Sequence, residues 1–183
     1  MVEVLSRAQF AFTVGFHIIW PTLSIGLCFF LVLIEALWLY TKDLNYLKLY
    51  KFWVRIFALS FAIGVVTGTP LSYQFGTNFS EFSKIAGNIM GPLLGVEVMT
   101  AFFLEAVFIG IMLFGWNRVG PKLHFMATFC VCLGTHNSSF WIIAANSWMH
   151  TPAGYSFQDG VIVVDSWKEV IFNPSFFYRF YYT

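Results

Sequence analysis

Two carboxylates lie inside a stretch of the sequence that is otherwise apolar. The stretch runs from Gly91 to Trp116, and Glu97 and Glu105 both stand well within it. An ionisable group near the centre of a bilayer costs at least about 2.5 kcal/mol on insertion scales, so acids at such positions are functional candidates by default. His17 occupies a comparable place in another apolar stretch. These residue types suit two kinds of chemistry, ligation of a metal centre and transfer of protons.

His17 and Glu97 are expected at a similar depth in the membrane. His17 follows about ten residues of its span, a depth of roughly 13 to 15 Å at 1.5 Å per residue, and Glu97 is about eight or nine residues in from the same side. A neutral imidazole is a strong ligand for haem iron, and a carboxylate from a facing helix can approach the opposite axial position. The pair therefore predicts a haem site between helices. The alternative is that ordinary hydrogen bonds satisfy each side chain.

Glu105 is the candidate for proton transfer. It follows Glu97 by eight residues, which at about 100° per residue places it some 80° further round a regular helix, still at the border of the same cavity. Its position nearer the cytoplasmic side suits a proton-relay carboxylate. A hydrogen bond to another helix is the alternative interpretation.

Other polar residues in the apolar stretches receive weaker interpretations. Glu35 is near the inner end of its stretch, so its carboxylate is expected to reach the interface and to have no chemical role. His124 and His150 flank another stretch, where titrating groups are ordinary. His136 is deeper and belongs to a polar patch that lines a hydrated path or, more commonly, forms hydrogen bonds between helices. The patch also contains Thr135, Asn137, Ser138 and Ser139.

The elements that must position these residues are membrane-spanning helices. Of 183 residues, 58% are hydrophobic and only 10% are charged, far outside the range of soluble proteins. A spanning helix needs about 20 mainly apolar residues. We therefore predict an all-α integral membrane bundle of four transmembrane helices over residues 1–148 and an outer-face, periplasmic-side tail over residues 149–183. The four stretches are Phe10 to Tyr40, Phe52 to Tyr73, Ile89 to Trp116 and Phe125 to Trp148.

The distribution of charge predicts how the bundle is oriented. Basic residues flank the first and third connections, whereas the second has only Lys84 against Glu81. The positive-inside rule then places both ends of the chain outside. The formal net charge of +1, with no basic cluster to spare, excludes a nucleic-acid binder. The flanking residues are Lys42, Lys48, Lys51, Arg55, Arg118 and Lys122.

The three cysteines predict no site of their own. Cys28, Cys130 and Cys132 all lie in expected spans, and their spacing is typical neither of a disulfide framework nor of a zinc site.

Two local patterns predict backbone geometry. Gly64 and Gly68 form a GxxxG pair, which permits close approach of another helix or of a flat ligand, helix packing being the more common use. In the tail, Asp159-Gly160 is a turn signal and residues 161–164 are a short extended candidate.

Four longer motifs together resemble subunit I of the cytochrome bd-type quinol oxidases, and in particular its cyanide-insensitive branch. The resemblance covers nearly the whole chain, and the combination is highly specific. The motifs are LSRAQFAFTVGFHIIWPTLSIG, GVVTGTPLSYQFGTNFSEFS, GPLLGVEVMTAFFLEAVFIGIMLFGWNR and GTHNSSFWIIAANSWMHTPAGY.

The resemblance implies roles for individual residues. His17 matches the axial ligand at the oxygen-reducing haem region, and Glu97 matches the carboxylate at that haem. Glu105 matches the acid associated with proton delivery and the neighbouring high-spin haem, and Ser138 lines the hydrophilic path. Residues around the haems and their propionates are matched by Arg7, Asn146 and Trp148.

The resemblance also implies cofactors, partners and location. It implies two b-type haems and one haem d or its b-type substitute, quinol oxidised at the outer face, and dioxygen reduced to water. An oxidase subunit II and membrane lipid are the expected partners, and the bacterial inner membrane, with a periplasmic N-terminus, is the expected location.

The chain departs from the family pattern in two respects. Family members are more than twice as long, so we expect this chain to be the N-terminal portion, without the quinol-binding loop, a methionine ligand and a further glutamate ligand. Tyr182 stands where the family has a histidine ligand of the low-spin haem, and a neutral phenol is a poor ligand for such a haem. Two alternatives stay open: a membrane module without turnover, and a bundle in which Glu97 and Glu105 conduct protons without haem.

Overall fold

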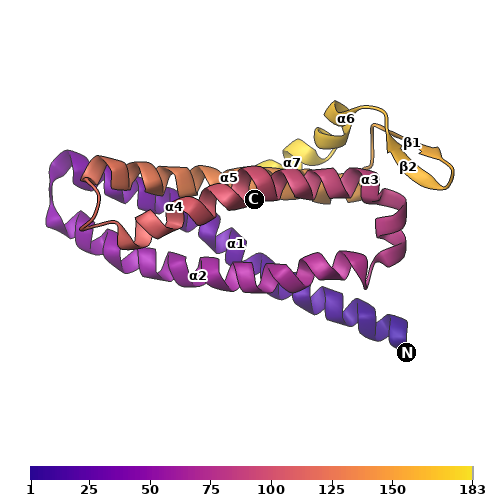
Figure 1. The fold of residues 1–183 in the computed structure, drawn as a ribbon, viewed down its shortest axis with the longest axis horizontal. Helices are drawn as coiled ribbons and strands as arrows, with labels where there is room; N and C mark the ends of the chain where they lie inside the picture. The colour runs from indigo at the N-terminus through magenta and orange to yellow at the C-terminus, as the bar shows by residue number, and fades with distance from the viewer. Residues whose placement is uncertain (183) are drawn as a thin grey trace.

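A computed structural model describes residues 1–182 of the chain. Its main elements are long helices that run side by side, with a small β-hairpin at one end (Figure 1). The helices are α1 (Val2–Thr41), α2 (Leu44–Gly76), α3 (Ser80–Glu97), the π-helix η1 (Val98–Phe102), α4 (Phe103–Phe114), α5 (Pro121–His150), α6 (Trp167–Ile171) and α7 (Phe176–Tyr182). The strands are β1 (Tyr155–Gln158) and β2 (Val161–Val164).

The first two helices form an antiparallel pair because the chain reverses within two residues. Lys42 ends α1 in the left-handed conformation, with φ of 60°. Asp43 then caps α2 by accepting a hydrogen bond from the backbone N–H of Asn45 at 2.8 Å. A carboxylate at this position satisfies one of the free N–H groups at the start of a helix. The connection is therefore tight and fixes the register of α1 against α2.

The helices α3, η1 and α4 form one continuous helical segment. Residues 80–114 comprise α3, η1 and α4 without a break, and together they form one candidate membrane span. The π-helical turns of η1 begin directly after Glu97. Such segments occur frequently at functional sites, because each turn takes more residues than an α-helical turn and re-aims the side chains that follow.

The predicted membrane character is confirmed, but the predicted number of spans is not. Among the described residues, three helices are long and apolar enough to cross a membrane: Val2–Thr41, Leu44–Gly76 and Ser80–Phe114. The fourth predicted span lies within α5, which is a continuous helix of 30 residues. Polar residues from Thr135 to Ser139 reduce the apolar character of this helix. Its helical structure is as predicted, but its passage through a membrane stays a prediction.

Two apolar cores lie at opposite ends of α5. One joins α1, α2, α4 and α5, and the other joins α3 and α5 to the hairpin and α6. Neither core includes residues 2–23 of α1, and the first buried residue of this helix is Ser24. In Figure 1 the N-terminal end of α1 projects away from the other helices.

The hairpin and the short helices fold against the end of α5. Strands β1 and β2 are antiparallel, with Tyr155 opposite Val164 and Gln158 opposite Val161. Asp159 and Gly160 form the turn, with φ of 51° and 82°, the positive pair that a two-residue hairpin loop requires. The turn and the extended segment predicted from the sequence are thus confirmed.

Candidate functional site

His17 lies on the face of α1 that packs against α2. Its Nδ1 is 2.9 Å from Thr67 Oγ1, and the Thr67 hydroxyl in turn donates to the backbone carbonyl of Ile63 at 2.8 Å. Because a hydroxyl has only one proton, the His17 Nδ1 must be the donor to Thr67. The imidazole is then held as the tautomer whose Nε2 carries a free lone pair. This is the usual arrangement of a histidine that ligates a metal through Nε2.

The GxxxG pair gives α1 the room to approach. A Cβ on Gly68 would lie 3.1 Å from Cε1 of His17, and a Cβ on Gly64 would lie 3.8 Å from Cβ of Trp20. The two glycines therefore receive side chains of α1, which is the helix-packing use of the motif. Gly68 is the tighter of the two, and it fixes where the His17 ring can lie.

Glu97 faces α5. Ser138 Oγ donates a hydrogen bond to Glu97 Oε1 at 2.6 Å, a short distance that is typical of a hydroxyl bound to a carboxylate. Glu97 is the last residue of α3 and lies directly before the wider turns of η1. Ser138, which the resemblance matches to the hydrophilic path, thus contacts Glu97 directly.

Glu105 also faces α5. A Cβ on Gly134 would lie 2.6 Å from Glu105 Cγ, and the side chain of Thr135 lies beside the carboxyl group. The eight-residue step was expected to turn Glu105 about 80° away from Glu97. A π-helical turn rotates the chain by fewer degrees per residue than an α-helical turn, so η1 reduces that offset. Both carboxylates consequently meet one face of α5, on which Gly134 and Ser138 are one turn apart.

Among residues 1–182, no ion pair joins Glu97 or Glu105 to a basic side chain. Glu105 is 7% exposed, and it is close enough to Glu97 for the two groups to repel each other when both are charged. The ion pairs of the described residues join Arg7 to Glu3, Lys84 to Glu81 and His124 to Glu35.

His17 and Glu97 are not in contact in the described chain. His17 packs against α2, whereas Glu97 accepts a hydrogen bond from α5, and within residues 1–182 no hydrogen bond or ion pair joins the two side chains. The single haem site predicted from their equal depth therefore remains a prediction.

The other residues matched by the resemblance lie apart from these two groups. Arg7 is exposed and pairs with Glu3 at 2.8 Å. Asn146 Oδ1 accepts a hydrogen bond from Arg179 at 2.9 Å. Trp148 is 2% exposed, and its indole N–H donates to the carbonyl of Ala153 at 3.0 Å. Tyr182 is 92% exposed, at the end of α7.

Sequence reasoning missed a buried polar network near the end of the bundle at which α1 connects to α2. Glu35 is 0% exposed and does not reach the interface: its Oε1 lies 2.6 Å from His124 Nδ1, and its Oε2 accepts from Thr128 at 2.6 Å. The other ring nitrogen of His124 donates to the carbonyl of Met112 at 3.1 Å, and the Tyr50 hydroxyl lies 2.8 Å from Thr128 Oγ1. These contacts give each of the named side chains a partner, and the network joins α1, α2, α4 and α5. The presence of both Glu and His in apolar stretches was the only signal in the sequence.

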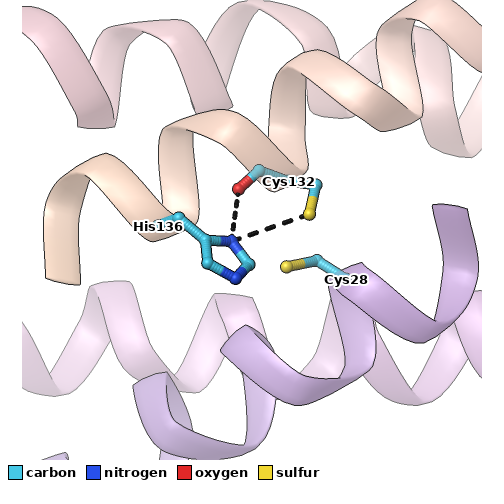
Figure 2. A group of neighbouring side chains, drawn as sticks. All are labelled: Cys28, Cys132 and His136. Carbon is cyan, nitrogen blue, oxygen red and sulfur yellow. Dashed lines mark hydrogen bonds between the residues drawn. The ribbon is translucent and has the colours of Figure 1, made fainter. Parts of the chain in front are cut away.

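A second cluster was also missed, because its members are far apart in the chain. Cys28 of α1 meets Cys132 and His136 of α5 (Figure 2), and one ligand atom from each of the three lies within 4.8 Å of the others. The expectation that the cysteines form no metal-type grouping was based on spacing between cysteines alone. It left out the four-residue step from Cys132 to His136.

Comparisons with known proteins point to one family. The family described as cytochrome bd terminal oxidase subunit I matches residues 5–183. Cytochrome bd ubiquinol oxidase subunit 1 of Bacillus subtilis (strain 168) is 42% identical over 177 residues, which are 97% of this chain and 38% of that relative. Cytochrome bd-II ubiquinol oxidase subunit 1 of Escherichia coli (strain K12) is 38% identical over 181 residues, which are 98% of this chain and 35% of that relative.

A solved structure agrees with these relatives. The bd oxidase from Geobacillus thermodenitrificans superposes with a TM-score of 0.90 and 31% sequence identity, over 97% of this chain and 41% of that one. The chain therefore spans well under half the length of the relatives it matches.

Proposed function

Because the chain belongs to the cytochrome bd terminal oxidase subunit I family, we propose that it is the haem-binding and proton-delivering part of a membrane quinol oxidase. The proposed overall reaction oxidises quinol and reduces dioxygen to water. The relatives of Bacillus subtilis and Escherichia coli are named as ubiquinol oxidase subunits, and this naming supports quinol as the reductant. An oxidase subunit II and membrane lipid are the proposed partners.

The proposed topology has four spans, with α5 as the fourth. Helices α1, α3 and α4 pack against α5 and cover part of its polar patch, which makes a less apolar span tolerable. The basic connections at residues 42–43 and 115–120 lie at one end of the bundle in Figure 1, away from the N-terminus and the hairpin. This arrangement supports a cytoplasmic end for those connections and a periplasmic N-terminus in a bacterial inner membrane.

The residues present fit a haem in their chemistry. A haem would supply an iron that binds dioxygen and accepts electrons, and a neutral imidazole nitrogen is one of the common ligands of haem iron. The observation that carries the proposal is the fixed tautomer of His17, because Thr67 takes the Nδ1 proton and leaves Nε2 free to ligate. The exposed N-terminal half of α1 provides an apolar surface for a macrocycle or for further helices. We assign b-type haem and haem d, or its b-type substitute, as the group bound.

Protons move along the acids that face α5. Glu105 is nearer the inner connections and takes up a proton, and Glu97 receives it next, since both carboxyl groups meet the same face of α5. Ser138 holds Glu97 Oε1 through its hydroxyl and so keeps the acceptor oxygen directed along α5. The two acids and Ser138 thus form consecutive positions of the proposed proton path along α5.

An absorbance spectrum tests the proposal. The complete protein is purified in mild detergent, its reduced-minus-oxidised spectrum is recorded, and haem is quantified against protein for wild type and for His17→Ala. His150→Ala is the matched control, since His150 is an exposed histidine at the end of α5. Haem lost in His17→Ala alone supports the proposal. A folded wild-type protein without haem would instead favour the proton-conducting bundle.

A further inference from the structure

Two thiols and an imidazole converge between α1 and α5. Cys28 and Cys132 are buried, and His136 is half-buried one helical turn beyond Cys132. Figure 2 shows the Cys28 sulfur of α1 pointing toward the His136 ring, with Cys132 on the same face of α5. Neither thiol is in a disulfide. None of the three residues belongs to the His17 pocket or to the Glu97 and Glu105 site.

The distances are those of ligands around one small ion. His136 Nδ1 lies 3.6 Å from Cys132 Sγ, and one ligand atom from each of the three residues lies within 4.8 Å of the others. A sulfur and a nitrogen bound to one tetrahedral zinc are about 3.5 Å apart, given bonds of roughly 2.3 and 2.0 Å. Residues four apart on a helix share a face, which is the spacing that helical metal sites use for two of their ligands. The Cys132 and His136 pair is thus already placed, and Cys28 needs only a small movement.

Metal binding replaces two hydrogen bonds to backbone carbonyls. Cys28 donates to the carbonyl of Ile25 at 3.1 Å within its own helix, and His136 Nδ1 donates to the carbonyl of Cys132 at 2.8 Å. Both carbonyls keep their own helical bonds when the side chain turns away. Binding a metal through these atoms releases the thiol proton of Cys28 and moves the imidazole proton of His136 from Nδ1 to Nε2.

The charge and softness of the ligands limit which metal ions can bind. Thiolate sulfur selects zinc, copper(I) and iron–sulfur clusters over hard cations. Two thiolates with one divalent cation and a neutral imidazole give a net charge of zero, which suits a site between apolar helices. Copper(I) reaches the same balance when one thiol keeps its proton. From these observations we infer that Cys28, Cys132 and His136 bind one thiophilic d¹⁰ cation, Zn²⁺ or Cu⁺, that joins α1 to α5.

The ion has a structural consequence for the proposed proton path. Thr135 lies beside Cys28 and beside Glu105, on the same turn of α5 as His136. A metal bond from α1 to this turn fixes α5 lengthwise and so keeps Thr135 in place. Cys28 is eleven residues from His17 along α1, about 16 Å at 1.5 Å per residue, so the metal and the proposed haem occupy different levels.

Metal analysis of the complete protein tests the inference. The protein is purified from its membranes in mild detergent without chelators, and zinc, copper and iron are measured against protein by mass spectrometry. The variants Cys28→Ser, Cys132→Ser and His136→Gln each remove one ligand. Cys130→Ser is the matched control, because it removes a half-buried thiol from the same helix outside the cluster. The metal-free protein is then titrated with Zn²⁺ alone and with Cu⁺ alone against a competing chelator.

The expected result is about one zinc or one copper per chain in wild type and in Cys130→Ser. Each ligand variant should lose at least about tenfold in affinity, since even changes outside the ligand set typically cost 10- to 100-fold. Removal of the metal should also lower the unfolding temperature of wild type and leave that of Cys132→Ser unchanged. Wild-type protein that holds neither metal and binds neither ion more tightly than Cys132→Ser would overturn the inference, as would a Cys28–Cys132 disulfide in the purified protein. Because zinc and copper are measured apart from haem iron, this outcome is independent of the proposed oxidase function.

Discussion

Thr67 and His17 are 50 positions apart in the chain and joined by a 2.9 Å contact between Oγ1 and Nδ1. The contact sets the tautomer and the orientation of the imidazole, so Thr67 is a positioning residue for a ligand on Nε2. Thr67→Val keeps the shape of the side chain and removes the hydroxyl. Haem affinity should fall by about 10- to 100-fold, the usual cost of losing the partner of a ligating histidine. The measurement is a haem titration followed by absorbance, together with the position of the absorbance band.

Thr69→Val is the matched control for that change. Thr69 is an exposed residue two positions further along α2, and its hydroxyl donates only to its own helix, to the carbonyl of Val65 at 3.1 Å. It should leave both affinity and spectrum unaltered. If Thr67→Val also left both unaltered, Thr67 would have no part in orienting His17.

Adding a methyl group at Gly68 tests whether the His17 ring must keep its position. In Gly68→Ala the new methyl group would lie 3.1 Å from Cε1 of His17, closer than ordinary packing allows, so the ring or the helix must move. We expect lower haem occupancy or a shifted spectrum, with a cost of about 1 to 3 kcal/mol for the added volume. Gly64→Ala is the control, since its methyl group would meet Trp20 at an ordinary 3.8 Å. Equal haem content in the two variants would show that the ring is free to move.

The sequence predicted the contact at these glycines because its signal is local. A GxxxG pair needs only the α-helical period, and the period of α2 is regular at that point. Likewise, the Asp159-Gly160 turn follows from the backbone preferences of two adjacent residues. Such features are determined by residues that are near each other in the chain.

The features that could not be predicted depend on register between distant helices or on irregular backbone. The π-helix η1 has the same composition as the α-helix around it, so nothing showed that Glu105 would turn onto the face of Glu97. The pairing of Glu35 with His124 spans 89 positions and requires knowing how far α5 slides along α1. The meeting of Cys28 with Cys132 and His136 requires that same register. The position of α5 along α1 could not be predicted from the sequence, and both of these clusters depend on it.

Glu105 should affect turnover more than haem binding. Glu105→Gln keeps the size of the side chain and removes the group that gives up a proton. We expect haem content to be unchanged and oxygen consumption by the complete oxidase with quinol to fall by about 10²-fold, the lower range for loss of a proton-transfer group. Glu81→Gln is the control, because Glu81 is an exposed carboxylate paired with Lys84. Loss of haem in Glu105→Gln would assign this residue to the haem pocket instead of the proton path.

The buried pair of Glu35 and His124 should affect stability and not haem. Both side chains are almost wholly buried, at 0% and 1% exposure, and the Glu35 carboxyl is also the partner of Thr128. Glu35→Ala leaves the imidazole and the hydroxyl without their partner, and breaking a buried pair from one side typically costs about 3 to 5 kcal/mol. The free energy of unfolding in mixed detergent, measured by helical circular dichroism, should fall by this amount.

A double variant separates the pairing from the volume of the side chains. In the double variant Glu35→Leu with His124→Leu, neither a carboxyl nor an imidazole is left without a partner. The loss of unfolding free energy should therefore be smaller than the sum of the losses in Glu35→Leu alone and His124→Leu alone. Glu3→Ala is the control, since Glu3 forms an exposed pair with Arg7 and its removal should change stability little. Additive losses in the double variant would mean that Glu35 and His124 contribute separately, through packing, and that their 2.6 Å contact is not what holds α1 to α5 at the inner end.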